Sequence, residues 1–395
     1  MATLSAPRAT FAPQVDAVSH KASAHVSWYI WCATLAATSL MIGAHWDISW
    51  HSSIGRDTFW TPAHMAIYAC GVLSGVAFGY LILHTTFSRS SPLAAGSVHI
   101  WGFRAPLGAF IASWGGIAML TSAPFDNWWH AAYGLDVKIV SPPHILLFIG
   151  GYGVLVGTMA LIAGHMNREA ESRRGAYARL FLYLCGVMFV LTMVVVMEYT
   201  ERPALHSTLP YVVLCAVTPV ILTVGSRATG LRFATTYVAA FYTCFLIGLI
   251  LVLPLFPAEP KLGPVYQHVT HFIPPQFPLL IIVPAFLLDL FGSKTRNLHP
   301  WANAILSAAI YLVGLVAAEW PFATFLMSPA ARNRFFGTMY LWYGAPPLSF
   351  TARDTFFPSQ HALQLALGFG LAFLFATVMF RSGASRGNWF RSIQR

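Results

Sequence analysis

The stretch PHILLFIGGYGVLVGTMALIAG, residues 143–164, contains no Lys, Arg, Asp or Glu. About 20 mostly apolar residues are enough for a helix to cross the hydrocarbon core of a bilayer, so this segment is long enough to span a membrane. Nine further candidate spans lie at 26–46, 63–84, 105–124, 180–198, 208–225, 233–254, 276–292, 301–320 and 361–380. The sequence therefore predicts an all-α fold, a polytopic transmembrane helical bundle of about ten spans.

The composition supports lipid as the solvent of this chain. Of its 395 residues, 57% are hydrophobic and only 9% are charged, whereas a soluble domain is typically about 25% charged. The formal net charge is +10, but no basic cluster is interleaved with aromatic residues in a polar domain, which argues against a nucleic-acid partner. The five cysteines lie in apolar runs without a C-x-x-C pair, which favours core roles over thiolate metal sites.

The distribution of basic residues predicts the orientation. With ten spans and the N-terminus inside, the inner segments hold 16 of the 23 Lys and Arg residues, so both termini are expected to be cytoplasmic. Residues 1–25 form a polar tail without the apolar core of a signal peptide. The expected location is a bacterial inner membrane, with the outer loops in the periplasm.

Two predicted outer loops repeat one pattern, HWDISWHSSIGRDTFWTPAHMAIY at 45–68 and FDNWWHAAYGLDVKIVSPPHILLF at 125–148. In each, an Asp is followed four positions later by a His, and a Pro and a second His then open the next helix. The first triad is Asp47, His51 and His64. The second triad is Asp126, His130 and His144.

This spacing suits a metal site. Residues at i and i+4 lie on one face of a helix, and the later His folds back from the next helix. Two imidazoles and one carboxylate form the ligand set of non-haem iron sites and also suit zinc or copper, with positions left open for water, oxygen or substrate. The alternative is a solvated, hydrogen-bonded pair at a helix end, against which the repetition argues. Asp57 and Asp136 are candidate acceptors for imidazole N–H groups or helix N-caps.

The stretch WHSSIGRDTFWTPAHM resembles the signature of the C subunit of the particulate methane and ammonia monooxygenases. In that family Asp-x3-His, with a His after twelve intervening residues, forms one copper site, and Asn-x3-His, with a His after thirteen, forms a second. The resemblance implies copper at both triads, with Asp126 in place of the family's Asn. It covers about residues 26–165, a four-helix region, and leaves the six-helix region 166–395 without an assigned role.

A weaker echo of the motif lies near the C-terminus, where RDTFFPSQH at 353–361 resembles RDTFWTPAH at 56–64. It makes His361 a weak ligand candidate. Gly344 and Leu348 stand where the earlier ligands would be, so a helix-start motif is favoured.

Two further groups of polar residues lie on the predicted outer side. His268 and His271 form an H-x-x-H, for which interfacial or hydrogen-bonding roles are favoured over ligation. Glu198 and Glu319 lie near outer helix ends and either line a proton path or reach water, the second being preferred.

These observations predict a copper-dependent membrane monooxygenase, or a subunit of one, that oxidises a small apolar or ammonia-like substrate with dioxygen. Iron and zinc remain alternative metals. The expected partners are membrane lipids and either other monooxygenase-type subunits or further copies of the chain. Two alternative functions stay open: a non-catalytic protein that stores or delivers copper or zinc, and a transporter with an outer His/Asp vestibule.

Overall fold

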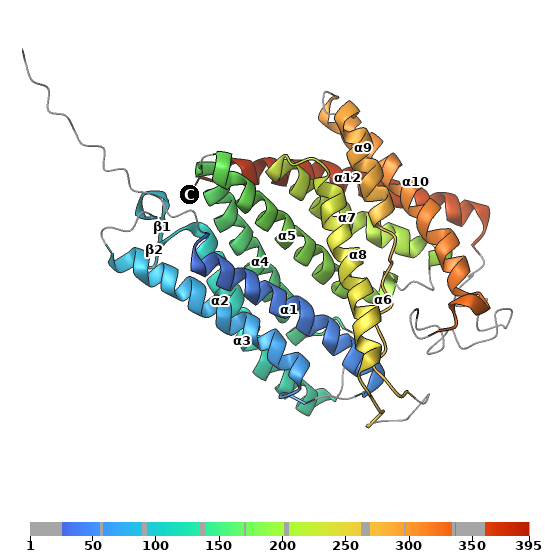
Figure 1. Ribbon diagram of the computed structural model, residues 1–395, viewed down its shortest axis with the longest axis horizontal. Coiled ribbons are helices and arrows are strands. Elements are labelled where there is room, and N and C mark those ends of the chain that lie inside the picture. Colours follow the sequence, from blue (N-terminus) through green and yellow to red (C-terminus); the bar gives the residue numbers. More distant parts are fainter. Residues whose placement is uncertain are drawn as a thin grey trace, which may run out of the picture.

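The computed structural model describes residues 26–55, 58–88, 93–134, 139–169, 171–200, 205–261, 269–295, 298–333, 336 and 360–394. These residues are mostly α-helical, and their strands form one short antiparallel hairpin (Figure 1). In chain order the elements are α1 (Trp28–Ser53), α2 (Pro62–Phe87), η1 (Ala94–Gly96), β1 (Val98–Ile100), β2 (Phe103–Ala105), α3 (Leu107–Tyr133), α4 (Pro142–Arg168), α5 (Glu171–Val195), α6 (Met197–Thr200), α7 (Thr208–Thr229), α8 (Ala234–Val252), η3 (Leu253–Leu255), α9 (Ile282–Thr295), α10 (Pro300–Leu326), η4 (Pro329–Ala331) and α12 (Ala362–Ser392).

Eight of the described helices are long and apolar enough to cross a membrane. They are α2, α3, α4, α5, α7, α8, α10 and α12. The helix content and the apolar composition of these helices confirm the prediction of an all-α helical membrane protein.

Two of the ten predicted spans are less apolar or shorter in the structure than the other eight. The segment 26–46 lies in α1, which has the length of a span but a lower mean hydropathy, because Trp, Thr, Ser and His interrupt its apolar residues. The segment 276–292 becomes helical only from Ile282, with Pro284 in the first turn. The resulting 14-residue helix extends about 21 Å, which is shorter than a hydrocarbon core of about 30 Å.

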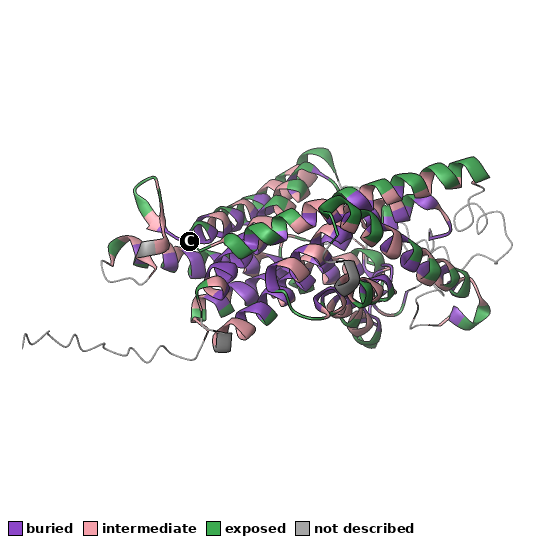
Figure 2. Cartoon of the chain, turned by 90° about the horizontal axis from the view of Figure 1, so that it is seen from above, coloured by how far each residue is buried: buried purple, intermediate pink, exposed green. Residues whose placement is uncertain are grey.

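The outer surface of the bundle is apolar, as a lipid-facing surface requires. Figure 2 shows buried residues in the interior and exposed residues along the outer helices. On α12, Leu363, Leu367 and Leu371 follow one another at i, i+4 spacing and are 69%, 65% and 44% exposed. A row of exposed leucines this long would be costly in water and is natural in lipid.

The helices α1 to α4 form a closed ring, because α1 contacts α2 and α4, and α3 contacts the same two helices. Glycines bring α3 and α4 unusually close. A Cβ atom on Gly115 would lie 2.5 Å from the backbone nitrogen of Val154, and one on Gly157 would lie 2.5 Å from the carbonyl oxygen of Gly108. The buried side chains of these four helices belong to one cluster with those of α5 to α12.

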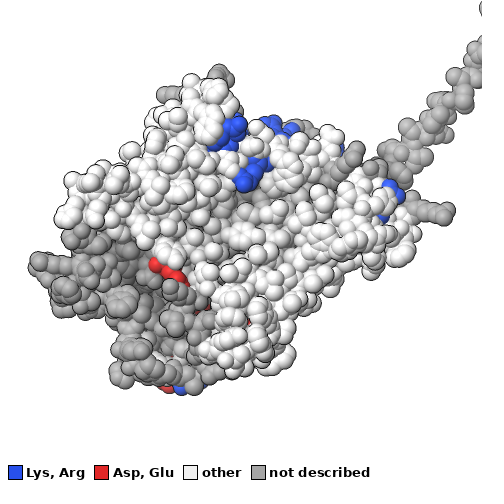
Figure 3. All heavy atoms as spheres, turned by 180° about the vertical axis from the view of Figure 1, so that it is seen from behind, with Lys and Arg blue, Asp and Glu red and all other residues white. Residues whose placement is uncertain are grey.

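The two ends of the bundle differ in charge. The triads lie where α1 and α3 end and α2 and α4 begin, and α5 also ends there. Arg168 and Arg227 lie in the last turns of α4 and α7, and Arg391 lies in the last turn of α12, at the opposite end. In Figure 3 the blue Lys and Arg atoms gather along one edge of a largely uncharged face. Asn167 joins α4 to α12 at this basic end by donating hydrogen bonds to the carbonyl oxygens of Phe390 and Ile393, at 2.8 and 2.7 Å.

Candidate metal centre

The first triad joins the end of α1 to the start of α2. Asp47 and His51 lie in the last two turns of α1, and His64 lies in the first turn of α2, after the proline that opens this helix. The Nε2 atom of His51 lies 3.7 Å from Oδ2 of Asp47, and Nε2 of His64 lies 3.5 Å from Oδ1 of the same carboxylate. The structure therefore brings the three side chains together, with the carboxylate between the imidazoles.

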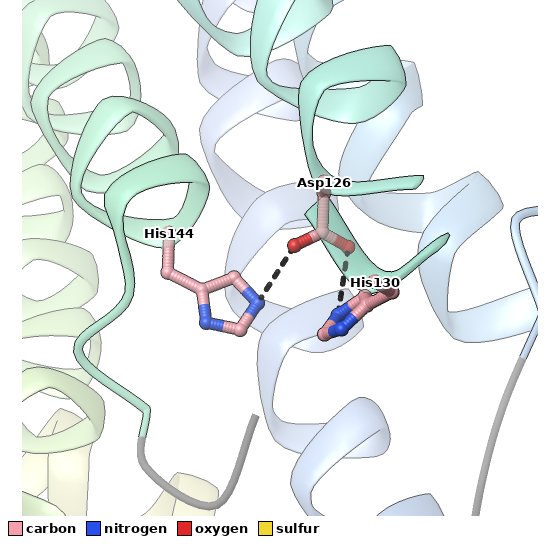
Figure 4. A group of neighbouring side chains, drawn as sticks. All are labelled: Asp126, His130 and His144. Carbon is pink, nitrogen blue, oxygen red and sulfur yellow. Dashed lines mark ion pairs between the residues drawn. The ribbon is translucent and has the colours of Figure 1, made fainter. Parts of the chain in front are cut away.

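The second triad repeats this arrangement at the end of α3 and the start of α4. The Nε2 atom of His130 lies 3.5 Å from Oδ2 of Asp126, and Nε2 of His144 lies 3.4 Å from Oδ1 (Figure 4). One potential ligand atom from each of the three side chains lies within 4.8 Å of the others. Two histidines and one aspartate from two helices thus converge on one point.

Glycine and proline residues determine where the helices that carry the triads end and begin. Gly55 follows α1 with φ 96°, and Gly134 follows α3 with φ 87°, which are conformations that residues with a Cβ rarely adopt. Each glycine turns the chain out of its helix directly after the Asp-x3-His turn. Pro62 and Pro142 then begin α2 and α4, because a proline in the first turn loses no helical hydrogen bond.

Three of the four histidines are oriented by backbone carbonyl groups. Nδ1 of His64 lies 3.0 Å from the carbonyl oxygen of Thr58, Nδ1 of His130 lies 3.1 Å from that of Gly134, and Nδ1 of His144 lies 2.9 Å from that of Ile139. A carbonyl oxygen only accepts, so Nδ1 carries the proton. In the neutral ring the lone pair is then on Nε2, which faces the aspartate. Histidines that bind metals are usually held in this way.

The second triad fits a cation by its donor chemistry. With Nδ1 turned to a backbone carbonyl, each imidazole directs its Nε2 atom at the Asp126 carboxylate, and 3.4–3.5 Å is longer than an ordinary N–H···O bond. Oδ1 of Asp126 is buried and accepts no hydrogen bond from the part of the chain that the structure describes. Ligand bonds of about 2.0–2.1 Å in a tetrahedral site would separate neighbouring ligand atoms by about 3.3–3.4 Å. The two Asp–His distances observed are thus close to those between neighbouring ligands of one cation.

A small cavity of about 80 Å³ lies between the two triads. Asp47 and His64 of the first triad and Asp126 and His144 of the second all line it. The remaining wall is mostly apolar and comes from five helices and the loop before α4: Ala44, Ile48, Ile67, Tyr68, Ser122, Ala123, Ile139, Pro143, Leu147, Phe148 and Val194. The two triads therefore open onto one shared apolar space, which the sequence had not predicted.

Of the remaining candidates from the sequence, the structure describes His361 and His271. Asp57, Asp136 and His268 lie outside the described residues. His361 is the N-cap of α12 and forms a capping box with Gln364, as the favoured helix-start interpretation requires. His271 lies at an exposed bridge to Pro257, with Nδ1 2.8 Å from the hydroxyl oxygen of Thr270.

Glu198 has a role at the second triad that its position in the sequence did not reveal. Its Oε1 atom accepts a hydrogen bond of 2.8 Å from the backbone N–H of Ile139, whose carbonyl oxygen accepts from His144. The short helix α6 thus positions the loop that orients a candidate ligand. The available signal was only that Glu198 ends the fifth predicted span on the side of the triads. Glu319, by contrast, is fully buried and accepts from the backbone N–H of Leu280.

We expect Glu198→Ala to weaken metal binding at the second triad by up to about tenfold, because the loop that orients His144 loses its anchor. Glu198→Gln keeps an acceptor oxygen and should bind metal nearly as well as the wild type. Chelator competition on both variants measures the difference. Equal weakening in both would show that the negative charge matters, and equal affinity in all three proteins would remove Glu198 from the site.

No family model matches the chain, and no curated protein or solved structure matches it either.

Proposed function

We propose that this chain is a copper-dependent membrane monooxygenase, or a subunit of one, acting on a small apolar or ammonia-like molecule with dioxygen. The observation that supports this proposal most strongly is the small apolar cavity between the two Asp/His triads. A cavity of this size admits only small molecules, and metal ligands from both triads line it. The resemblance of residues 26–165 to the monooxygenase C subunit supports copper at both positions.

In this proposal the side chains have separate tasks. Asp47 and Asp126 supply negative charge, and the histidines supply nitrogen ligands whose orientation is held by backbone carbonyls. The apolar wall excludes water from the space between the triads. Bound copper would supply the binding and activation of dioxygen, and iron would also be redox-active, whereas zinc would not. Oxygen insertion also consumes two electrons and two protons per dioxygen, from a donor outside this chain.

Metal storage or delivery is a second candidate function, favoured by one observation. The His51 side chain is 51% exposed, whereas that of His64 is 15% exposed, so the first triad has one ligand accessible from outside the bundle. An exchange site needs such access. The position of the triads argues against a transporter. Transporters usually bind their substrates near the bilayer midplane, whereas these triads lie at helix ends.

Filling the cavity distinguishes an oxygenase from a storage protein. Ala123 lines the cavity, so we expect Ala123→Leu to retain metal and to lose most substrate oxidation, measured as incorporation of isotopically labelled dioxygen into product. Thr121→Leu, at an exposed position on the same helix, is the matched control. Retained metal without oxidation of any small substrate by the wild-type protein, in the presence of a reductant, would favour storage or delivery.

We further propose ten spans, in which α1 and the segment 276–292, made of non-helical residues 276–281 and the first part of α9, complete the eight. Both termini would lie in the cytoplasm and the triads on the periplasmic side of a bacterial inner membrane. The basic residues at the end opposite the triads support this orientation. We expect an impermeant maleimide to label Ser52→Cys in intact cells and Ser392→Cys only after the cells are opened, because both positions are exposed at opposite ends. The wild-type chain supplies the background from its own cysteines. The reverse pattern would invert the topology.

A further inference from the structure

A second, larger cavity of about 560 Å³ lies between α4, α5, α7 and α12. Its wall is almost wholly apolar: Val156, Met159, Cys185, Met188, Ala216, Val217, Val220, Ile221, Val224 and Phe390. A volume of this size is typical of sites that bind drug-sized or lipid-like molecules. Three of the four helices lie wholly or largely outside the region that resembles the monooxygenase subunit.

The polar groups of this cavity are unevenly placed. Tyr152 and Thr192 lie at the end nearer the triads, where their hydroxyl oxygens are 2.6 Å apart, and the Thr192 hydroxyl donates to the carbonyl oxygen of Met188. Both hydroxyls are thus satisfied within the protein. At the other end the cavity is lined by Arg386 and Trp389, which lie within the last seven residues of α12. The cavity therefore has an apolar body and one cationic end.

Arg386 is suited to an anionic group. Its side chain is exposed, and none of the ion pairs between residues that the structure describes involves it. The next residue, Gly387, packs against Arg227, and this end of the bundle is basic. Arginine binds phosphate oxygens with paired hydrogen bonds, and tryptophan favours the boundary between lipid and water.

The length of the cavity matches part of a lipid tail. On α7 its wall runs from Ala216 to Val224, or about 12 Å at 1.5 Å per residue. One leaflet of the hydrocarbon core is about 15 Å thick. A chain that entered at the Arg386 end would extend through most of a leaflet before reaching the Tyr152–Thr192 pair.

We propose that this cavity is a binding site for one anionic phospholipid, with its phosphate at Arg386 and an acyl chain between α4, α5, α7 and α12. The site is independent of the metal chemistry proposed above. The complementary charge at the basic end selects the anionic headgroup over a zwitterionic or neutral one. The bound lipid would join α12 to α4, which carries His144 of the second triad, and to α5, which carries Val194 of the smaller cavity.

Lipid exchange on the purified full-length protein tests this proposal. The detergent-solubilised protein is incubated with mixed micelles of phosphatidylglycerol and phosphatidylcholine, separated from free lipid, and its retained lipids are quantified by mass spectrometry. We expect the wild type to retain about one phosphatidylglycerol in preference to phosphatidylcholine. Arg386→Gln should lower that preference about fivefold, as expected for the loss of one cation near a headgroup. Arg391→Gln, an exposed arginine on the same helix that does not line the cavity, should leave the preference unchanged.

A second variant separates the chain-binding part from the headgroup. Ala216→Leu fills the apolar body and should reduce retention of both lipids while leaving Arg386 intact. Equal retention by the wild type and Arg386→Gln, or equal loss in Arg386→Gln and Arg391→Gln, would overturn the assignment of the phosphate to Arg386. Preferential retention of phosphatidylcholine or of an uncharged isoprenoid quinone by the wild type would overturn the anionic occupant.

Discussion

His144→Ala is expected to remove about one equivalent of metal per chain. The second triad would retain one imidazole and one carboxylate, and a site with two protein ligands binds a metal weakly. His130→Ala should have the same effect, since both histidines approach Asp126 at 3.4–3.5 Å. Elemental analysis of the purified protein gives the stoichiometry, and spectroscopy separates copper from iron.

The matched control for this experiment is His99→Ala, which removes an exposed histidine of the β1–β2 hairpin that belongs to neither triad. Its metal content should equal that of the wild type. The first triad should keep its own metal in His144→Ala, so the loss should be partial. Unchanged stoichiometry in folded His144→Ala and His130→Ala would reduce the second triad to a hydrogen-bonded cluster.

Asp126→Asn is expected to weaken binding of a divalent metal at the second triad by roughly 10–100-fold, the range found for changes in the shells around a bound metal. The substitution keeps the shape of the side chain but replaces a charged oxygen with a neutral carbonyl. A carboxylate with two imidazoles suits divalent iron, zinc or copper and is a poorer match for cuprous ion. The variant would also carry the Asn expected from the proposed resemblance to the monooxygenase subunit, and its relative preference for cuprous ion should rise.

Competition with a calibrated chelator measures both affinities. Asp289→Asn serves as the control, because Asp289 accepts hydrogen bonds from the backbone and hydroxyl of Thr236, away from the triads. If wild type and Asp126→Asn bind equally well, Asp126 is not a ligand, and the buried Oδ1 atom has some other partner.

Much of the fold followed from apolar segment lengths. Eight of the ten predicted spans correspond to helices long and apolar enough to cross a membrane, because about 20 mostly apolar residues have few alternatives to a helix in lipid. The differences arise where composition is mixed. α1 carries Asp47 and His51 of the first triad. The segment 276–292 follows Pro274 and Pro275 and contains Pro278 and Pro284, so its helix starts only at Ile282.

The composition of each triad also came from the sequence. Asp-x3-His places two side chains on one face of a helical turn, and a short loop that ends in a proline returns the second histidine to the same place. These are local relations, fixed by helical geometry over a few residues. The pairing of Asp126 with His130 and His144 therefore needed no knowledge of distant contacts.

Only the tertiary structure decided that the two triads face one cavity, that Val194 of α5 helps to close it, and that Glu198 supports the loop before His144. It also decided that His361 caps a helix and that α12 completes a lipid-sized cavity with α4, α5 and α7. The physical reason is that helix–helix distances depend on packing between segments far apart in the chain. The close approach of α3 and α4 at Gly115 and Gly157 is one such contact, and no periodicity within either helix specifies its partner.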